Sequence, residues 1–154
     1  MTKNSSQSGR SMVEMLGVIA IIGLITVAGV TSMGYVDSYF RSSATVIEID
    51  DIAKNVIDTY SWSKDFSSLS MATICSEGIL KCSGENHKVT NRWGGNISVA
   101  ITAGDTSSFT ITYTAVPKIP CEQLLNSSNE NEFHYVTAQN ITCSDNSTMQ
   151  FILK

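Results

Sequence analysis

The chain has 154 residues, of which 42% are hydrophobic and 16% charged, and its formal net charge at neutral pH is −4. This acidic balance, with no basic stripe to neutralise phosphate, argues against a nucleic-acid-binding protein. The sequence has only two histidines, no glycine-rich phosphate loop, no nucleophile elbow and no helix with His and Glu at metal-binding spacing. We therefore expect no enzymatic activity, no cofactor and no metal site.

An uncharged apolar run, residues 15–36, follows a short polar leader that ends in Gly9-Arg10. At ~1.5 Å per residue, a helix of this length is just over ~30 Å long and can cross the hydrocarbon core of a bilayer. The run is longer than the apolar stretch of roughly 7–15 residues in a secretory signal peptide. A plain membrane anchor explains the length but leaves Glu14 unexplained, because a carboxylate at the margin of a membrane helix usually has a partner.

Two partners for Glu14 are open. Arg10 lies one helical turn upstream and can form an exposed ion pair with it. Alternatively, cleavage between Gly9 and Arg10 creates a new α-amino group, a cation that Glu14 of a neighbouring subunit can neutralise within lipid. The second reading makes the segment an assembly device as well as an anchor.

The segment SGRSMVEMLGVIAIIG, residues 8–23, resembles the class III signal of type IV pilins. In that family a prepilin peptidase cuts after the glycine, and the apolar helix becomes first a membrane anchor and then the filament core. The resemblance implies cleavage at Gly9, an N-methylated mature terminus at Arg10, and Glu14 as the residue that sets the register between subunits. The chain departs from the family at Arg10, where phenylalanine or methionine is common, and at Thr31, near the position of a frequent proline.

The apolar pattern continues beyond the membrane run at spacings of three and four, which predicts one face of an amphipathic helix. We expect this helix over residues 37–62, after the leader at 1–9 and the membrane and filament-core helix at 10–36, and before a globular domain at 63–154. The serine-rich residues 61–70 are expected to end it. The predicted face consists of Val36, Tyr39, Phe40, Ile47, Ile49, Ile52, Ala53, Val56, Ile57 and Tyr60.

Four cysteines lie in the predicted globular domain, which is small enough to need covalent support. An even number in an exported domain favours disulfides, and three pairings are possible. Cys75–Cys82 closes a local loop around Gly78, and Cys121–Cys143 resembles the C-terminal disulfide-bounded region of many pilins, so we prefer this pairing. A zinc site with Cys75, Cys82 and His87 is a minor alternative, because paired CxxC elements are absent.

Two alternating segments between the cysteines predict an antiparallel hairpin, the first at residues 97–102 and the second at 109–114. Residues 103–108 are expected to form its turn. The stretch 93–96 predicts a turn with a packed Trp93, Pro120 is expected to open a short helix through Leu125, and residues 133–137 and 149–153 are candidate final strands. The predicted fold is α+β, the type IV pilin fold: a long N-terminal helix on a small antiparallel sheet domain with disulfides.

The resemblance implies a structural subunit of a type IV pilus, most similar to the type IVb or conjugative thin-pilus group. Its implied partners are like subunits, a prepilin peptidase, a membrane platform protein and an assembly ATPase. Its implied location is the bacterial inner membrane and, after assembly, an extracellular filament for adhesion, motility or conjugation. The alternatives are a type II secretion pseudopilin, a minor pilin, or a membrane-tethered periplasmic binding module that keeps its leader.

Overall fold

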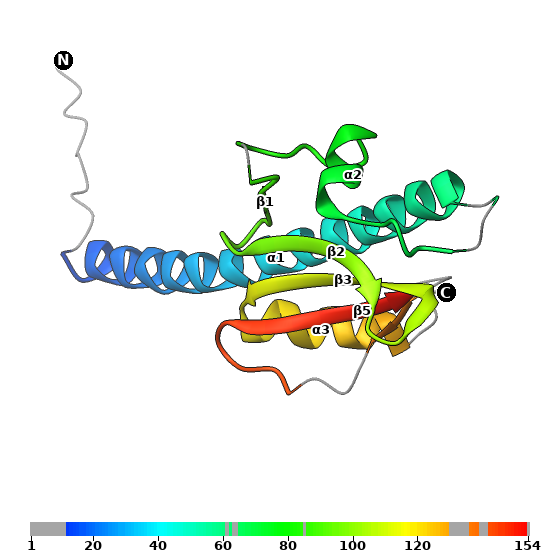
Figure 1. Ribbon diagram of the computed structural model, residues 1–154. Helices are drawn as coiled ribbons and strands as arrows, with labels where there is room; N and C mark the ends of the chain where they lie inside the picture. Colours follow the sequence, from blue (N-terminus) through cyan, green and yellow to red (C-terminus); the bar gives the residue numbers. More distant parts are fainter. Residues whose placement is uncertain are drawn as a thin grey trace, which may run out of the picture. The chain divides into compact units, whose positions relative to one another are not determined.

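The computed structural model describes residues 12–60, 62, 65–84, 86–129, 136–138 and 142–153 (Figure 1). The chain divides into two compact units, Met1–Asp37 and Ser38–Lys154. One helix, α1 (Met12–Tyr60), supplies the described part of the first unit and continues into the second. The described helix ends at Tyr60, residue 61 lies outside the described residues, and Trp62 lies in a turn, in agreement with an end near the serine-rich residues 61–70.

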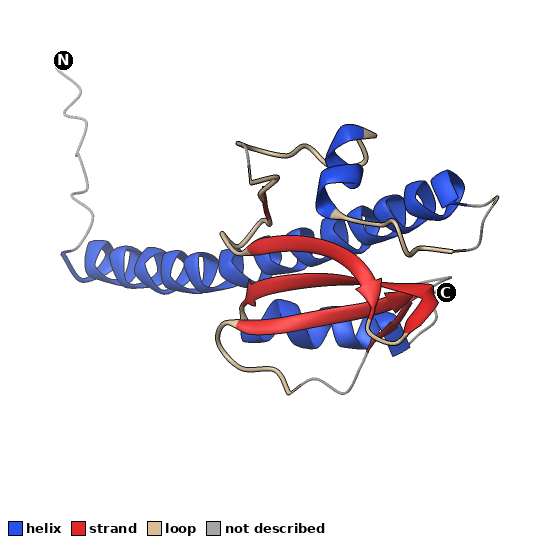
Figure 2. Ribbon diagram, viewed as in Figure 1, coloured by secondary structure: helices blue, strands red, loops and turns tan. Residues whose placement is uncertain are grey.

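The second unit is built on a five-stranded antiparallel sheet with the strand order β1-β2-β3-β5-β4 (Figure 2). Two further helices complete it, one before the sheet in the chain and one between its third and fourth strands. The predicted α+β arrangement, a long N-terminal helix packed on an antiparallel sheet, is confirmed. The bounds are α2 (Met71–Ser76), β1 (Val89–Thr90), β2 (Asn96–Thr102), β3 (Asp105–Val116), α3 (Lys118–Asn129), β4 (Val136–Ala138) and β5 (Ser147–Leu153).

Alternation of apolar and polar residues decides which face of the sheet is buried, because successive side chains of a strand point to opposite faces. The register places Val99 of β2 opposite Ile111 of β3, and Ile111 opposite Phe151 of β5. All three side chains are at most 1% exposed. The predicted strands at 97–102, 109–114 and 149–153 are confirmed, and their inward residues form the core with the buried face of α1.

The buried face of α1 consists of Ile49, Ile52, Ala53 and Val56, each at most 2% exposed. The prediction of one continuous apolar face from Val36 onwards is wrong. Tyr39, Phe40 and Ile47 are 62%, 66% and 62% exposed. At ~100° per residue, Ile47 and Ile49 point ~200° apart, so the apolar pattern changes from one side of the helix to the other between these two residues.

Two small polar residues of α1 that the predicted apolar face did not include, Ser42 and Thr45, are buried. The hydroxyls donate to the carbonyl oxygens of Ser38 and Arg41, four residues earlier, at 2.9 and 2.8 Å. Because each hydroxyl is satisfied within the helix, its burial does not leave an unpaired polar group. A search for helical periodicity that counts only apolar residues does not identify these positions as buried.

Turn geometry differs from the prediction at two places. The hairpin turn is only Ala103-Gly104, with Thr102 paired to Asp105, and residues 105–108 belong to β3. Gly104 has φ +85°, which glycine adopts without a Cβ clash. Helix α3 begins at Lys118, so Pro120 lies inside its first turn, where its missing N–H is not required.

The remaining predictions near the sheet have mixed outcomes. Trp93 lies in a turn and packs against the core as expected. Strand β4 begins at Val136, and residues 133–135 of the predicted strand lie outside the described residues. Helix α2 and the two-residue strand β1 were not predicted, because both are too short to show a hydrophobic period.

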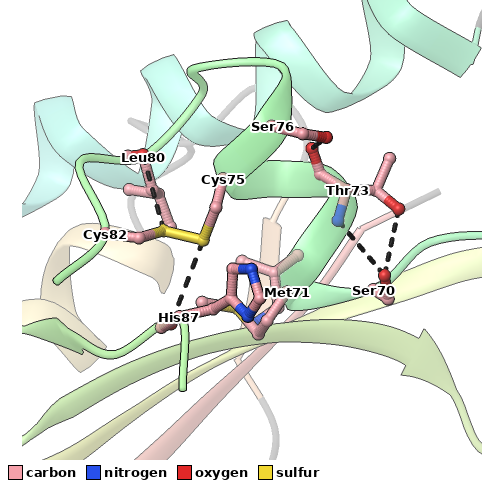
Figure 3. The surroundings of a disulfide bond; sticks show 9 residues. Ser70, Met71, Thr73, Cys75, Ser76, Leu80, Cys82 and His87 are labelled. Carbon is pink, nitrogen blue, oxygen red and sulfur yellow. Dashed lines mark hydrogen bonds between the residues drawn. A yellow bond between two sulfur atoms is a disulfide. The ribbon is translucent and has the colours of Figure 1, made fainter. Parts of the chain in front are cut away.

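Two disulfides cross-link the second unit, Cys75–Cys82 and Cys121–Cys143, which is the pairing preferred from the sequence. The first joins the end of α2 to the segment before β1, and its sulfur lies beside the His87 carbonyl, 3.9 Å away (Figure 3). The two loops differ in length, with sequence separations of 7 and 22 residues. Loop-closure entropy therefore assigns the larger stabilisation to Cys121–Cys143.

The double variant Cys75→Ser, Cys82→Ser is expected to lower the free energy of unfolding by about 2 kcal/mol, the loop-entropy value for so short a loop. Urea unfolding of the full chain in detergent micelles, followed by tyrosine and tryptophan fluorescence, measures it. An unchanged transition midpoint would mean that α2 and its packing hold this loop without the covalent link.

Candidate assembly surface

The described part of the first unit presents an exposed apolar helix surface. The large hydrophobic side chains between Met12 and Val36 range from 51% exposed at Val36 to 83% at Met12. One 18-residue window of α1 has a mean hydropathy of 2.4, none of it is buried, and the helix is long and apolar enough to cross a membrane. A core helix of a soluble domain would be mostly buried, whereas this helix is exposed and has the length and composition that lipid or neighbouring helices can cover.

Two hydroxyl groups within this apolar segment, those of Thr26 and Ser32, are satisfied inside the helix. Thr26 Oγ1 donates to the Ile22 carbonyl and Ser32 Oγ to the Ala28 carbonyl, both at 2.8 Å. Internal hydrogen bonds of this type allow a polar side chain to enter an apolar environment without an unpaired donor. These residues are therefore compatible with both lipid and a packed helix bundle.

Four glycines interrupt the exposed helix surface: Gly17, Gly23, Gly29 and Gly34. A Cβ atom built on any of them meets no atom of the described chain within 4 Å. No intramolecular contact within the described residues therefore requires glycine there. Small residues at a helix surface permit close approach of a second helix, and glycine also lowers helix stability.

Glu14 lies in the first turn of α1, the end of the helix where its dipole favours a negative charge. Gly9 and Arg10, the residues predicted to flank the cleavage site, lie outside the described residues. Cleavage after Gly9, methylation of Arg10 and the pairing of Glu14 thus stay predictions from the sequence.

The second unit also exposes apolar side chains of α1. Tyr39 and Phe40 are 62% and 66% exposed, and their rings meet edge to face at 6.3 Å between centroids. Ile47 lies about two turns further along. The sequence pattern included these residues but assigned them to the wrong face of the helix.

A cavity of about 440 Å³ lies between α1 and the segment around residues 79–92. Glu48 contributes to its wall and accepts a hydrogen bond from the hydroxyl of buried Tyr113 at 3.3 Å. Burial, and then the charge of Glu48, raise the pKa of the Tyr113 hydroxyl, whereas Arg92 lowers it by a smaller amount. The sequence indicated Tyr113 as a core residue but gave no signal of a partner 65 positions away.

The Tyr113–Glu48 contact predicts a stability difference that depends on pH. Tyr113→Phe is expected to lower the free energy of unfolding by about 1 kcal/mol at pH 7, because the hydrogen bond is lost. The native phenol keeps its proton above pH ~10, where an unfolded tyrosine releases it, so the wild-type advantage falls as pH rises beyond ~10. Paired unfolding curves between pH 7 and 11 test this, and a constant difference would contradict it.

The cysteines do not form a metal site. Cys75 and Cys82 are oxidised to a disulfide, so their sulfurs cannot act as thiolate ligands, and the alternative zinc site with His87 is wrong. In the described part of the chain, no group of three or more His, Cys, Asp and Glu side chains is placed to hold a metal ion. His134 lies outside that part.

A protein-family model described as PilS N terminal matches residues 40–151 of the 154-residue chain. The match covers most of the second unit and includes both disulfides. It begins after the exposed apolar segment, so Gly9, Arg10 and Glu14 lie outside it. A search of curated proteins found no match.

Proposed function

We propose, from the premise that this chain belongs to the PilS N-terminal family of type IVb pilins, that it is a prepilin whose mature form polymerises into an extracellular filament. The family consists of non-enzymatic structural proteins. The proposal goes beyond family membership in three respects: the processing site, the assembly into a polymer and the roles of individual residues.

The observation that carries the proposal is the change of environment along α1. Its first part exposes side chains such as Leu24, 74% exposed, whereas Ile49 and Val56 are fully buried against the sheet domain. One part of this helix packs on the sheet domain, whereas the other part exposes apolar side chains. The exposed part is suited first to lipid and then to a bundle of helices. Lipid covers the exposed part before assembly, and neighbouring helices cover it in the filament.

In the proposed sequence of events, a prepilin peptidase removes residues 1–9 and N-methylates Arg10. Glu14 then meets the positive amino terminus of a subunit at the base of the growing filament, because both charges are costly in lipid when unpaired. A membrane platform protein and an assembly ATPase drive extrusion of the subunit from the inner membrane. These partners come from the resemblance of residues 8–23 to the class III signal.

Mass spectrometry of native protein in sheared surface filaments tests the proposal. We expect a mature chain that begins at Arg10, recovered in a sedimenting polymer. A pseudopilin would be processed in the same way but would be absent from surface filaments. A permanently monomeric protein that still begins at Met1 would contradict the proposal and favour a tethered periplasmic module.

A further inference from the structure

The cavity beside α1 has two charged walls of opposite sign. Glu48 and Asp51 lie on the α1 side, and Lys81 and Arg92 lie on the facing segments. Among the residues that the structure describes, no ion pair joins any of these four side chains to another. A ligand with a positive and a negative group can therefore contact both walls without displacing an existing salt bridge.

The floor of this cavity is apolar. Ile52, Leu80 and Val89 line it and are 2%, 8% and 8% exposed. A cavity with an apolar floor between an acidic and a basic wall favours a partner with an apolar side chain flanked by a basic and an acidic residue.

The N-terminal end of α3, residues 118–122, has this pattern. Lys118 and Glu122 are exposed, with side-chain exposures of 59% and 53%, and their charged atoms are 4.0 Å apart. Ile119, 40% exposed, lies between them in the sequence and is the one exposed large hydrophobic in the described residues after Trp62. An exposed ion pair contributes little free energy, so both charges can change partners on binding at small cost.

The cavity and the N-terminal end of α3 lie on different sides of the second unit. Ser42 of α1 contacts Gln123 of α3 at 2.7 Å, and Asp51 of the cavity wall is nine residues further along α1, or ~180° around the helix. Figure 1 likewise shows β1 and α3 on opposite sides of β2 and β3. Two different surfaces that face apart join copies head to tail, and such an interface generates a ring if the rotation between copies closes and an open filament if it does not.

We propose that the N-terminal end of α3 in one copy, with Lys118, Ile119 and Glu122, docks into the cavity of the next copy. Lys118 faces Glu48 and Asp51, Ile119 covers the apolar floor, and Glu122 faces Lys81 and Arg92. This inference rests on the proposed filament and specifies a contact between its globular units, in addition to the packing of the apolar helices.

Charge reversal tests the contact in the full chain. Lys118→Glu and Asp51→Lys are each expected to lower the filament yield about fivefold, and the double variant is expected to restore it to within about twofold of wild type. Asp50→Lys is the matched control, because Asp50 is an exposed neighbour that does not line the cavity. The contact would be overturned if both single variants reduced the filament yield and the double variant did not restore it. It would also be overturned if neither single variant changed the yield.

Cross-linking separates this contact from the filament itself. Purified filaments of the double variant Ala44→Cys, Ile119→Cys are expected to form a ladder of covalent oligomers on oxidation, since Ala44 lines the cavity. Asp50→Cys with Ile119→Cys should form none. Filaments without a ladder would overturn the contact and leave the proposed function intact, whereas absence of wild-type filaments would overturn both. If the cysteine variant does not polymerise, the charge-reversal rescue decides.

Discussion

Replacing Glu14 with glutamine is expected to leave cleavage after Gly9 intact and to reduce filament yield at least about tenfold. In the proposed assembly, the variant removes the anion that neutralises a positive amino terminus in lipid, where a central charge costs ~2.5–3.5 kcal/mol. Loss of about half of that value corresponds to a factor of about ten in an equilibrium constant. Mass spectrometry of the membrane-bound pool measures cleavage, and sedimentation of sheared filaments measures assembly.

Asp50→Asn is the matched control for this charge removal. Asp50 is an exposed acid on the same helix, far beyond the membrane segment, so its neutralisation should leave both processing and filament yield near the wild-type level. Normal filaments from the Glu14 variant would exclude the proposed role of this residue. They would not affect the family membership, which depends on residues 40–151.

Gly95→Ala is expected to lower the stability of the second unit by about 3 kcal/mol, the upper end of the usual range for overpacking. A Cβ atom at this position would overlap the backbone carbonyl of Thr114. That carbonyl already accepts a hydrogen bond from the Asn91 side chain at 2.7 Å. Rotation of a side chain cannot relieve an overlap with backbone, so strand β3 or the turn itself has to move.

The turn has little freedom to move, because Asn91 holds both of its ends. Its Oδ1 accepts hydrogen bonds from the backbone N–H groups of Trp93 and Gly95 at 3.0 and 2.9 Å. On the facing strand, Ala115 already has φ +56° at the irregularity between β3 and β5. A shift would therefore break hydrogen bonds on both sides of the contact.

The neighbouring glycine supplies the control. Gly94 has φ +85°, but a Cβ there meets nothing within 4 Å, so Gly94→Ala should cost only the ~1–2 kcal/mol of a left-handed alanine. Chemical unfolding of both variants compares the steric cost of a Cβ atom at residue 95 with the backbone-conformational cost of alanine at residue 94. Equal losses of stability at the two positions would show that the backbone around Thr114 adapts readily.

Local sequence patterns were sufficient for the central strands. Apolar and polar residues alternate at 97–101 and 109–113, and this alternation predicts a strand with one buried face. Successive side chains of any strand point to opposite faces, so the prediction does not require knowledge of the neighbouring strands. Strand ends and turns were less accurate, because the polar residues at 105–108 are typical of a turn yet Asp105 pairs with Thr102 and begins β3. The Asn91–Gly95 turn was visible only as a Trp-Gly-Gly sequence, without its contact to Thr114.

The candidate site could be predicted in part. The exposed apolar segment of α1 follows from composition and length alone, and the family match to the remainder of the chain supports its interpretation. The cavity with Glu48 and Lys81, and its proposed counterpart at Ile119, had no sequence signal. These residues are brought to two surfaces by packing, and no spacing along the chain records that arrangement.

The amino-acid sequence by itself determined that the chain has a membrane-length apolar helix, a small disulfide-linked domain and an antiparallel sheet. These features depend on local period, length and cysteine number. Only the tertiary structure decided that α1 buries Ile49 and Val56 but exposes Tyr39 and Ile47. Hydrophobic spacing shows that a helix has an apolar side, but which side becomes covered depends on the neighbours that the rest of the fold places against it.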